Sequence, residues 1–165
     1  MSATILAETE ARFRADPSAA RSTPTVTASL VNGRARLSAG PFNWDADLPA
    51  ALGGENLAPS PTAYLLGALA GCAVAFLRDT LAPQFGVEID DVSAVASAAS
   101  DLRGLLAIDG AAPDLTDLAL DIRIVTASPD DRTAAMLDAW KQRCPIYLAL
   151  LQPNTITLTT SASAN

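Results

Sequence analysis

The chain has 165 residues, of which half are hydrophobic and 18% are charged, as in an ordinary globular protein with one domain or two small lobes around a shared core. Eleven basic and eighteen acidic side chains give a net charge of -7, which repels phosphate backbones and anionic lipid surfaces. We therefore expect no nucleic acid and no membrane partner. The sequence contains no histidine, which excludes Ser-His-Asp hydrolysis, histidine-containing zinc sites and acid–base catalysis by imidazole.

The first 24 residues differ in pattern from the rest of the chain. Residues 3–15 have the pattern of a short amphipathic helix, and residues 17–24 form a linker rich in proline, serine and threonine. The start lacks a basic region followed by an apolar one, so it is not typical of a secretory signal. We expect an N-terminal helix and linker over residues 1–24, a single domain over residues 25–165, and a cytoplasmic location.

Three short strands are predicted next, over residues 25–30, 34–38 and 42–47. Asn32-Gly33 is typical of a tight hairpin turn between the first two strands. Gly and Pro then break the pattern before the third strand. The segment therefore predicts a three-stranded meander.

An uncharged apolar run over residues 56–77 predicts a long helix at about residues 61–81. Ser60 can cap this helix, and Pro61 fits its first turn, where a missing N–H costs nothing. The run approaches the length of a membrane span, but its prolines, glycines and alanines make it only weakly hydrophobic. We therefore expect a central helix that is buried by protein on most sides.

One stripe of this helix carries a cysteine among large apolar side chains. The stripe has spacings of four, three and four residues, and it consists of Leu65, Leu69, Cys72 and Phe76. The small residues elsewhere on the helix leave room for another backbone to approach closely. Such a helix suits a packed interface.

The remaining elements follow from alternation, caps and breaks. They are two extended runs at residues 87–102 and 115–126, a helix that opens at Asp130-Asp131 and closes at Pro145, a shorter helix at residues 146–151, and a final Thr- and Ile-rich strand at residues 155–160. The order β-β-β-α-β-β-α-β defines an α+β fold with strands grouped on both sides of the central helix that carries Cys72.

The two cysteines are the leading candidates for chemistry. In a reducing compartment they are expected as thiols or as a transient redox pair, with two small buried hydrophobes as the alternative. Cys144 precedes Pro145, which begins a helix, and Lys141 and Arg143 are close in sequence, so local chemistry makes Cys144 the more acidic thiol. Cys72 lies in the middle of a helix, where burial would raise its pKa.

Two segments resemble the OsmC/Ohr family, the osmotically induced and organic hydroperoxide resistance proteins. They are residues 59–72, PSPTAYLLGALAGC, and residues 143–147, RCPIY. The hairpin at residues 32–34 and the Leu-Gly-Gly at residues 52–54 also fit the family. The resemblance covers roughly residues 25–160.

The resemblance implies an intertwined homodimer with two active sites at the subunit interface. Cys72 would attack an organic hydroperoxide, and Cys144 would resolve the sulfenic acid as a disulfide, which reverses the ranking from local chemistry. An external dithiol, often of the lipoyl type in the family, would restore the thiols, so no cofactor is expected. The apolar stripe would accept a fatty or aromatic hydroperoxide, with ordinary core as the alternative; its pocket residues are Tyr64, Leu65, Leu69 and Phe76.

The chain departs from the family pattern at the residues that activate the thiol. Active members carry a glutamate where this chain has Thr62 and Ala63. They also use an arginine that contacts the thiolate, and Leu52 stands at one of its two positions. Arg34 or Arg36 in the first hairpin is the remaining candidate, with an exposed strand arginine as the alternative. A non-catalytic or degenerate dimer that binds an apolar ligand is the alternative function.

Other chemistries have weaker support. Adjacent aspartates, as at Asp90-Asp91 and Asp130-Asp131, point apart on a strand or cap the start of a helix. The Gly-Gly pair at residues 53–54 is not a phosphate loop, because no Gly-Lys-Ser/Thr follows it. Two distant thiols and scattered carboxylates offer too few ligands for a metal.

Overall fold

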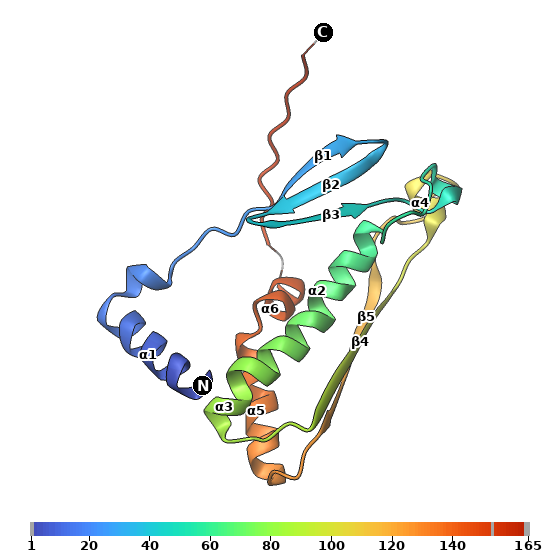
Figure 1. The fold of residues 1–165 in the computed structure, drawn as a ribbon. Coiled ribbons are helices and arrows are strands. Elements are labelled where there is room, and N and C mark those ends of the chain that lie inside the picture. Colours follow the sequence, from blue (N-terminus) through green and yellow to red (C-terminus); the bar gives the residue numbers. More distant parts are fainter. Residues whose placement is uncertain (1, 153, 164–165) are drawn as a thin grey trace.

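The structure is a computed structural model that describes residues 2–152 and 154–163. Its helices and strands, in chain order, are α1 (Ser2–Ala15), β1 (Thr27–Val31), β2 (Arg34–Ala39), β3 (Phe42–Ala46), α2 (Pro61–Phe76), α3 (Ala82–Phe85), β4 (Asp91–Ala99), α4 (Leu102–Leu105), β5 (Thr116–Val125), α5 (Asp130–Arg143) and α6 (Pro145–Leu151). Short 3-10 turns lie at Pro17–Ala20 and Ala50–Leu52. Figure 1 shows their arrangement.

The first sheet is the predicted antiparallel meander, in the order β1-β2-β3. Val31 pairs with Arg34 across the first turn, and the two turn residues, Asn32 and Gly33, have φ angles of 50° and 78°. Two successive positive φ angles make the tight turn that Asn-Gly favours. The prediction of three short strands is therefore confirmed.

The long helix begins where its capping residues predict. The Ser60 hydroxyl accepts a hydrogen bond of 3.2 Å from the backbone N–H of Ala63, and Pro61 occupies the first turn. After Phe76 the helix continues through a π-helical turn, η3 (Leu77–Leu81), into α3. Gly86, with φ of 62°, ends α3 in the left-handed conformation that glycine adopts without strain.

The helical stretch Pro61–Phe85 is long and apolar enough to cross a membrane by length and composition alone. The core helix of a soluble protein meets the same criteria. Here Leu77 and Leu81 are fully buried, in a core that also contains Met136 and Trp140 of α5. In this fold, the stretch contributes the centre of the core.

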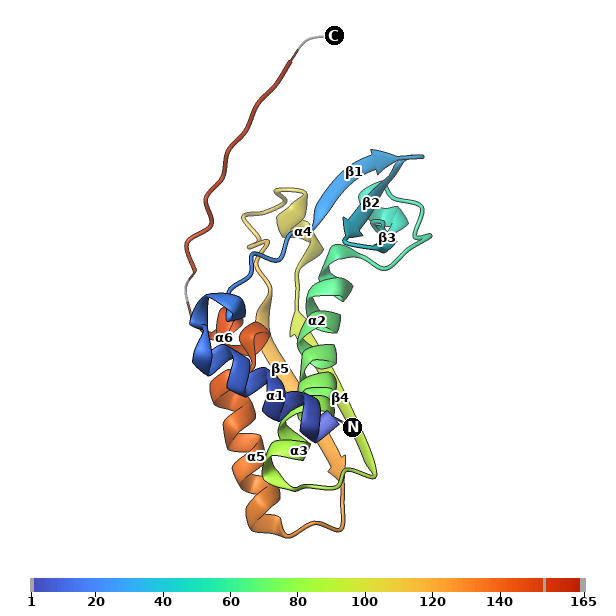
Figure 2. The same ribbon diagram turned by 60° about the vertical axis from the view of Figure 1, so that its left-hand side comes forward.

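The second sheet is the β4–β5 hairpin, whose alternation the sequence predicts. Asp91 pairs with Val125, and every second residue of β4 from Val92 onward is shielded from solvent. This face packs along α2, while α5 packs against η3 and α3, and α6 packs against α2 (Figures 1 and 2). β4 is shorter than the predicted run of residues 87–102 at both ends: it begins only at Asp91, and at its other end Asp101 caps α4 instead of continuing the strand.

The burial of α2 is narrower than expected. Only Leu69 and Ala73 of α2 itself are fully buried, and a side chain added at Gly67 or Gly71 would meet nothing within 4 Å among the described residues. One stripe of the helix is buried by its own chain, and the opposite face is open. The expectation of burial on most sides is wrong for the single chain.

The predicted final strand is not formed. Residues 154–163 are extended and unpaired within the described part of the chain, and they lead away from the fold (Figures 1 and 2). Ile156 and Leu158 are 87% and 82% exposed. A strand requires a partner for its backbone N–H and C=O groups, and this segment has none among the described residues, so the prediction is wrong here.

Candidate functional site: a pair of cysteines

Two cysteines that are distant in sequence lie side by side in the fold. The Sγ atoms of Cys72, on α2, and Cys144, between α5 and α6, are 3.1 Å apart, and both residues are free thiols. A disulfide bond is about 2.05 Å long, so a shift of about 1 Å would allow the bond to form. The paired sulfurs are the strongest candidate for a reactive site.

The junction of α5 and α6 places the Cys144 sulfur. The backbone N–H of Cys144 donates to the Trp140 carbonyl at 2.9 Å, which completes α5, and the Cys144 carbonyl accepts from Leu148 at 3.0 Å, which starts α6. Cys144 itself is extended, with φ of -68° and ψ of 112°, because the following Pro145 disfavours a helical conformation. The Arg-Cys-Pro motif therefore joins two helices at the sulfur.

The two sulfurs differ in burial. Cys144 is completely buried in the core cluster that includes Ala73, Leu77, Met136 and Trp140. Cys72 is half-buried and packs against the edge of the same cluster. Cys72 is therefore the residue of the pair that is open to solvent.

Burial raises the pKa of the Cys72 thiol to about 11, and the neighbouring Cys144 sulfur contributes to the rise. A hydrogen bond from the backbone N–H of Ile146, in the first turn of α6, acts in the opposite direction. No cation among the described residues contributes to this pKa. With a pKa raised in this way, the Cys72 thiol is almost wholly protonated at pH 7. The single chain does not activate Cys72.

The candidate arginine lies at the other end of α2. Arg34 lines a cavity of about 250 Å³ together with Asp47, Gly54 and Pro61. Cys72 comes eleven residues after Pro61, which is about 16 Å along the helix axis at 1.5 Å per residue. The structure therefore does not bring Arg34 to the Cys72 of its own chain.

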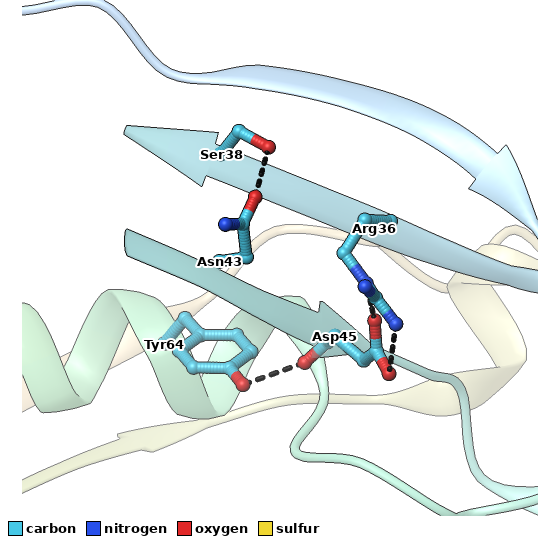
Figure 3. A network of polar contacts seen from close by, with 5 residues as sticks. All are labelled: Arg36, Ser38, Asn43, Asp45 and Tyr64. Carbon is cyan, nitrogen blue, oxygen red and sulfur yellow. Dashed lines mark hydrogen bonds and ion pairs between the residues drawn. The ribbon is translucent and has the colours of Figure 1, made fainter. Parts of the chain in front are cut away.

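The charge of Arg34 is incompletely paired. Its Nε atom is buried and has no hydrogen-bond partner in the described part of the chain. Arg36, the second candidate, forms an ion pair across the strands with Asp45, with Nη2 and Oδ2 at 3.3 Å (Figure 3). Arg36 is therefore already engaged, and Arg34 has an unused donor.

Asp47 organises the loop that closes the Arg34 cavity. Its buried carboxylate accepts hydrogen bonds from the backbone N–H groups of Leu48, Glu55 and Leu57, at 2.8, 3.2 and 2.9 Å. These bonds, led by that of Leu57, lower the pKa of Asp47 against the opposing effect of burial. The loop is tight, because a Cβ at Gly54 would lie 2.0 Å from the Leu48 carbonyl oxygen. The sequence analysis missed this role, although an aspartate before a Pro- and Gly-containing loop is a known signal.

The four residues of the predicted substrate pocket do not share one cavity. Tyr64 lines an apolar groove of about 430 Å³ between the first sheet and α2, with Val26, Leu37 and Trp44. Leu69 lines a separate cavity, Leu65 is 39% exposed, and Phe76 packs at the edge of the core. Their shared role in substrate binding stays a prediction.

A second apolar cavity has Leu69 of α2 in its wall. It measures about 140 Å³, and Leu69 lies one helical turn before Cys72. Its other walls come from β5 and α6: Leu118, Ala119, Leu120, Tyr147, Leu150 and Leu151. The Tyr147 ring lies 4.9 Å from that of Trp140, which ties this wall to the core around Cys144. Tyr147 belongs to the RCPIY motif, so the sequence motif could have indicated that this residue lies near the site.

Metal chemistry has no support in the described residues. No group of three or more Cys, Asp or Glu side chains within residues 2–152 and 154–163 could hold a metal ion. The site therefore consists of two sulfurs, a backbone N–H and apolar walls.

The α+β fold with a cysteine pair at its central helix defines a class of proteins. Residues 53–159 match the sequence model of the OsmC-like protein family, and the chain belongs to this family. No curated protein sequence matches the chain.

Solved structures show the same fold. An OsmC-like protein from Mycoplasma pneumoniae is similar with a TM-score of 0.65 and 19% identity, over 79% of this chain and 88% of that one. An organic hydroperoxide resistance protein from Legionella pneumophila has a TM-score of 0.58 and 21% identity, over 78% and 89%. Another, from Elizabethkingia anophelis, has a TM-score of 0.58 and 16% identity, over 78% and 88%. At these identities the likeness establishes the fold.

Proposed function

We propose that this protein is a thiol-dependent peroxidase that reduces organic hydroperoxides through a Cys72 sulfenic acid and a Cys72–Cys144 disulfide. The observation that carries the proposal is the distance of 3.1 Å between the two sulfurs, one reachable from solvent and one buried. The names of two structurally similar proteins, organic hydroperoxide resistance proteins, point to the same substrate class.

The proposed cycle has three steps. The Cys72 thiolate attacks the distal oxygen of the hydroperoxide, the O–O bond breaks, and the alcohol leaves with a proton. The Cys144 sulfur then attacks the sulfenic sulfur of Cys72, and water leaves as the disulfide forms. An external dithiol, of the lipoyl type, transfers two electrons to the disulfide and restores both thiols. A reducing cytoplasm is the proposed location for this cycle.

Apolar side chains near the sulfur support an organic substrate. Leu69, one helical turn before Cys72, lines an apolar cavity together with residues such as Leu120 and Tyr147. Hydrogen peroxide would gain nothing from these walls, whereas a fatty or aromatic group would leave water by contact with them. We therefore propose a hydroperoxide with an apolar group as the substrate.

Activation of Cys72 requires a charge that the single chain does not supply. We propose that the protein acts as an intertwined homodimer, in which Arg34 of a second copy approaches Cys72. Arg34 forms none of the ion pairs among the described residues, and Cys72 has a pKa of about 11 with no cation to lower it. An opposite charge within about 4–6 Å favours the thiolate and would lower this pKa by about 1–3 units.

The surface of the single chain supports the homodimer. The chain exposes 11872 Å², whereas a compact monomer of 17.0 kDa is expected to expose about 7,700 Å². Much of this excess is apolar, and it includes Leu30, Phe42, Ile156 and Leu158, each at least 70% exposed. The open face of α2 and the unpaired tail are further surfaces that a second copy could cover.

One observation favours the alternative, a non-catalytic dimer that binds an apolar ligand. The groove of about 430 Å³ beside Trp44 and Tyr64 is the largest of the cavities described above and is almost wholly apolar. Thr62 and Ala63 stand where active members carry a glutamate, so the thiol chemistry lacks one of its usual supports. In this alternative the groove would bind the ligand, and the cysteines would be ordinary core residues.

Thiol counting and turnover separate the two functions. Reduced protein should consume cumene or tert-butyl hydroperoxide with dihydrolipoamide, and one equivalent of hydroperoxide should remove both thiols. Cys72→Ser should abolish consumption, whereas Cys144→Ser should react once and stop at a sulfenic acid that dimedone traps. Unchanged thiols and no turnover would reject the peroxidase and favour the ligand-binding alternative.

A further inference from the structure

The two cysteines of the pair differ in their exposure to solvent. Cys144 has no exposed surface and is enclosed by side chains of the core, including Met136 and Trp140. Cys72 keeps part of its surface exposed, at the edge of that core. This difference decides which sulfur an external thiol can reach.

Thiol–disulfide exchange has a directional requirement. The attacking sulfur, the central sulfur and the leaving sulfur lie in a line, so the attacker approaches the central sulfur from the side opposite to its bonded partner. For Cys144 this side is occupied by the core, and an attacker would have to displace packed side chains. Cys72 is only partly buried, so an attacker can approach it without displacing the whole core.

We infer that the reducing dithiol attacks the Sγ atom of Cys72, so that the mixed disulfide forms on Cys72 and Cys144 is the leaving group. The inference rests on the proposed peroxidase cycle. In that cycle, the hydroperoxide and the reducing dithiol would both react at the Cys72 sulfur. Cys144 then reacts only with Cys72.

The step balances without a further reactant. A thiolate of the dithiol bonds to Cys72 Sγ, the Cys72–Cys144 bond breaks, and Cys144 leaves as a thiolate that takes up a proton. The second thiol of the reductant then attacks the reductant sulfur that is bonded to Cys72, and Cys72 leaves as a thiolate. The two protein sulfurs gain two electrons, and the dithiol becomes a cyclic disulfide.

The entry of the substrate supports the same route. A hydroperoxide has to reach Cys72 for the first step, so the passage to this sulfur is already required in the assembled protein. The dithiol uses this passage after the alcohol and water have left. Hydroperoxide and reductant therefore compete for one opening, and each excludes the other while it is bound.

The direct test locates a mixed disulfide. The oxidised protein, prepared with one equivalent of cumene hydroperoxide or with diamide, is treated briefly with glutathione, quenched in acid, denatured and alkylated with N-ethylmaleimide. Peptide mass spectrometry should find glutathione on Cys72 and the maleimide on Cys144, with a preference of about tenfold or more, because access decides the site of attack. Equal labelling, or glutathione on Cys144, would overturn the inference.

The diamide sample separates this inference from the proposed function. If hydroperoxide leaves both thiols reduced while the diamide disulfide still directs glutathione to Cys72, the peroxidase proposal fails and the regiochemistry stands. The single-thiol variants give an independent measurement with 5,5′-dithiobis(2-nitrobenzoate). Cys72 in Cys144→Ser should react in the native protein, and Cys144 in Cys72→Ser should react only after denaturation. Equal native reactivity of the two thiols would contradict the burial argument.

Discussion

The two ends of α2 belong to differently constructed regions. At its C-terminal half, α2 packs with the β4–β5 hairpin, α5 and α6 into a core with fully buried residues such as Leu77 and Met136. At its N-terminal end, the β1–β3 sheet stands away from this core, with every residue of β1 exposed (Figure 2). The first region forms a buried core within one chain and is called the self-contained region, whereas β1 in the second region has no buried residue.

The two cysteines and Arg34, the candidate for lowering the pKa of Cys72, therefore lie in different regions. Both cysteines lie in the self-contained region, so their proximity requires no partner. Arg34 lies in the exposed sheet, at the other end of the helix. The proximity of the two sulfurs is a property of the single chain, whereas the acidity of Cys72 is proposed to be a property of an assembly.

The largest expected effect is in the self-contained core. Leu77→Ala removes a side chain with no exposed surface and should lower the free energy of unfolding by about 2–5 kcal/mol, since the cavity left behind cannot close fully. Urea denaturation measures the loss. The matched control is Leu105→Ala at the tip of the hairpin, where the side chain is 57% exposed and the change should stay within about 0.5 kcal/mol. Equal losses at the two positions would contradict the division of the molecule.

The next effect tests the proposed activation across chains. Peroxide consumption needs the Cys72 thiolate, so it should rise with pH through the pKa of Cys72. Without Arg34 of the second copy this pKa stays near about 11, so Arg34→Met should shift the pH–rate profile upward by about 1–3 units. Stopped-flow rates between pH 6 and pH 10 test this, with Arg36→Met as the control whose profile should not move. A profile unchanged by Arg34→Met would remove this arginine from the mechanism.

The C-terminal tail sharpens the comparison further. If a second copy covers the tail, Leu158→Asp should weaken the dimer by about 1.5–3 kcal/mol, because a buried leucine becomes a carboxylate. Light scattering over a dilution series measures the change. Thr157→Asp provides the matched control, since neighbouring residues of a strand face opposite sides. A monomeric wild-type protein, or equal effects of both changes, would count against a role for the tail in assembly.

The smallest effect concerns the hydrogen bond that links the exposed sheet to α2. The Tyr64 hydroxyl donates a hydrogen bond of 2.6 Å to the backbone carbonyl of Asp45 on β3 (Figure 3). The Tyr64 ring also lies 6.5 Å from that of Trp44. Tyr64→Phe keeps the ring and removes the hydrogen bond, so the free energy of unfolding should fall by about 0.5–1.5 kcal/mol. Hydrogen exchange in β1–β3 should increase more than in β4–β5. An equal increase in both sheets would show that this hydrogen bond does not stabilise the β1–β3 sheet specifically.

The sequence predicted the elements well where local patterns decide them. Asn32-Gly33 set the first hairpin, Ser60-Pro61 set the start of α2, and Pro145 set the break between α5 and α6. Alternation failed for residues 155–160, because a strand depends on a partner that no local pattern specifies. The open face of α2 was missed for the same reason, since a run of alanine and glycine fits both a core and an interface.

The absence of histidine, the net charge and the two cysteine motifs were enough to indicate sulfur chemistry and the OsmC-like family. Only the tertiary structure decided that the sulfurs of Cys72 and Cys144 meet at 3.1 Å, that Cys144 is the enclosed residue, and that Arg34 shares a cavity with Pro61, which lies about 16 Å before Cys72 along the helix. Spacing along a chain determines caps, turns and helical faces, because these depend on neighbours in sequence. Burial and the distance between remote side chains depend on how the elements pack, and the packing is a property of the whole fold.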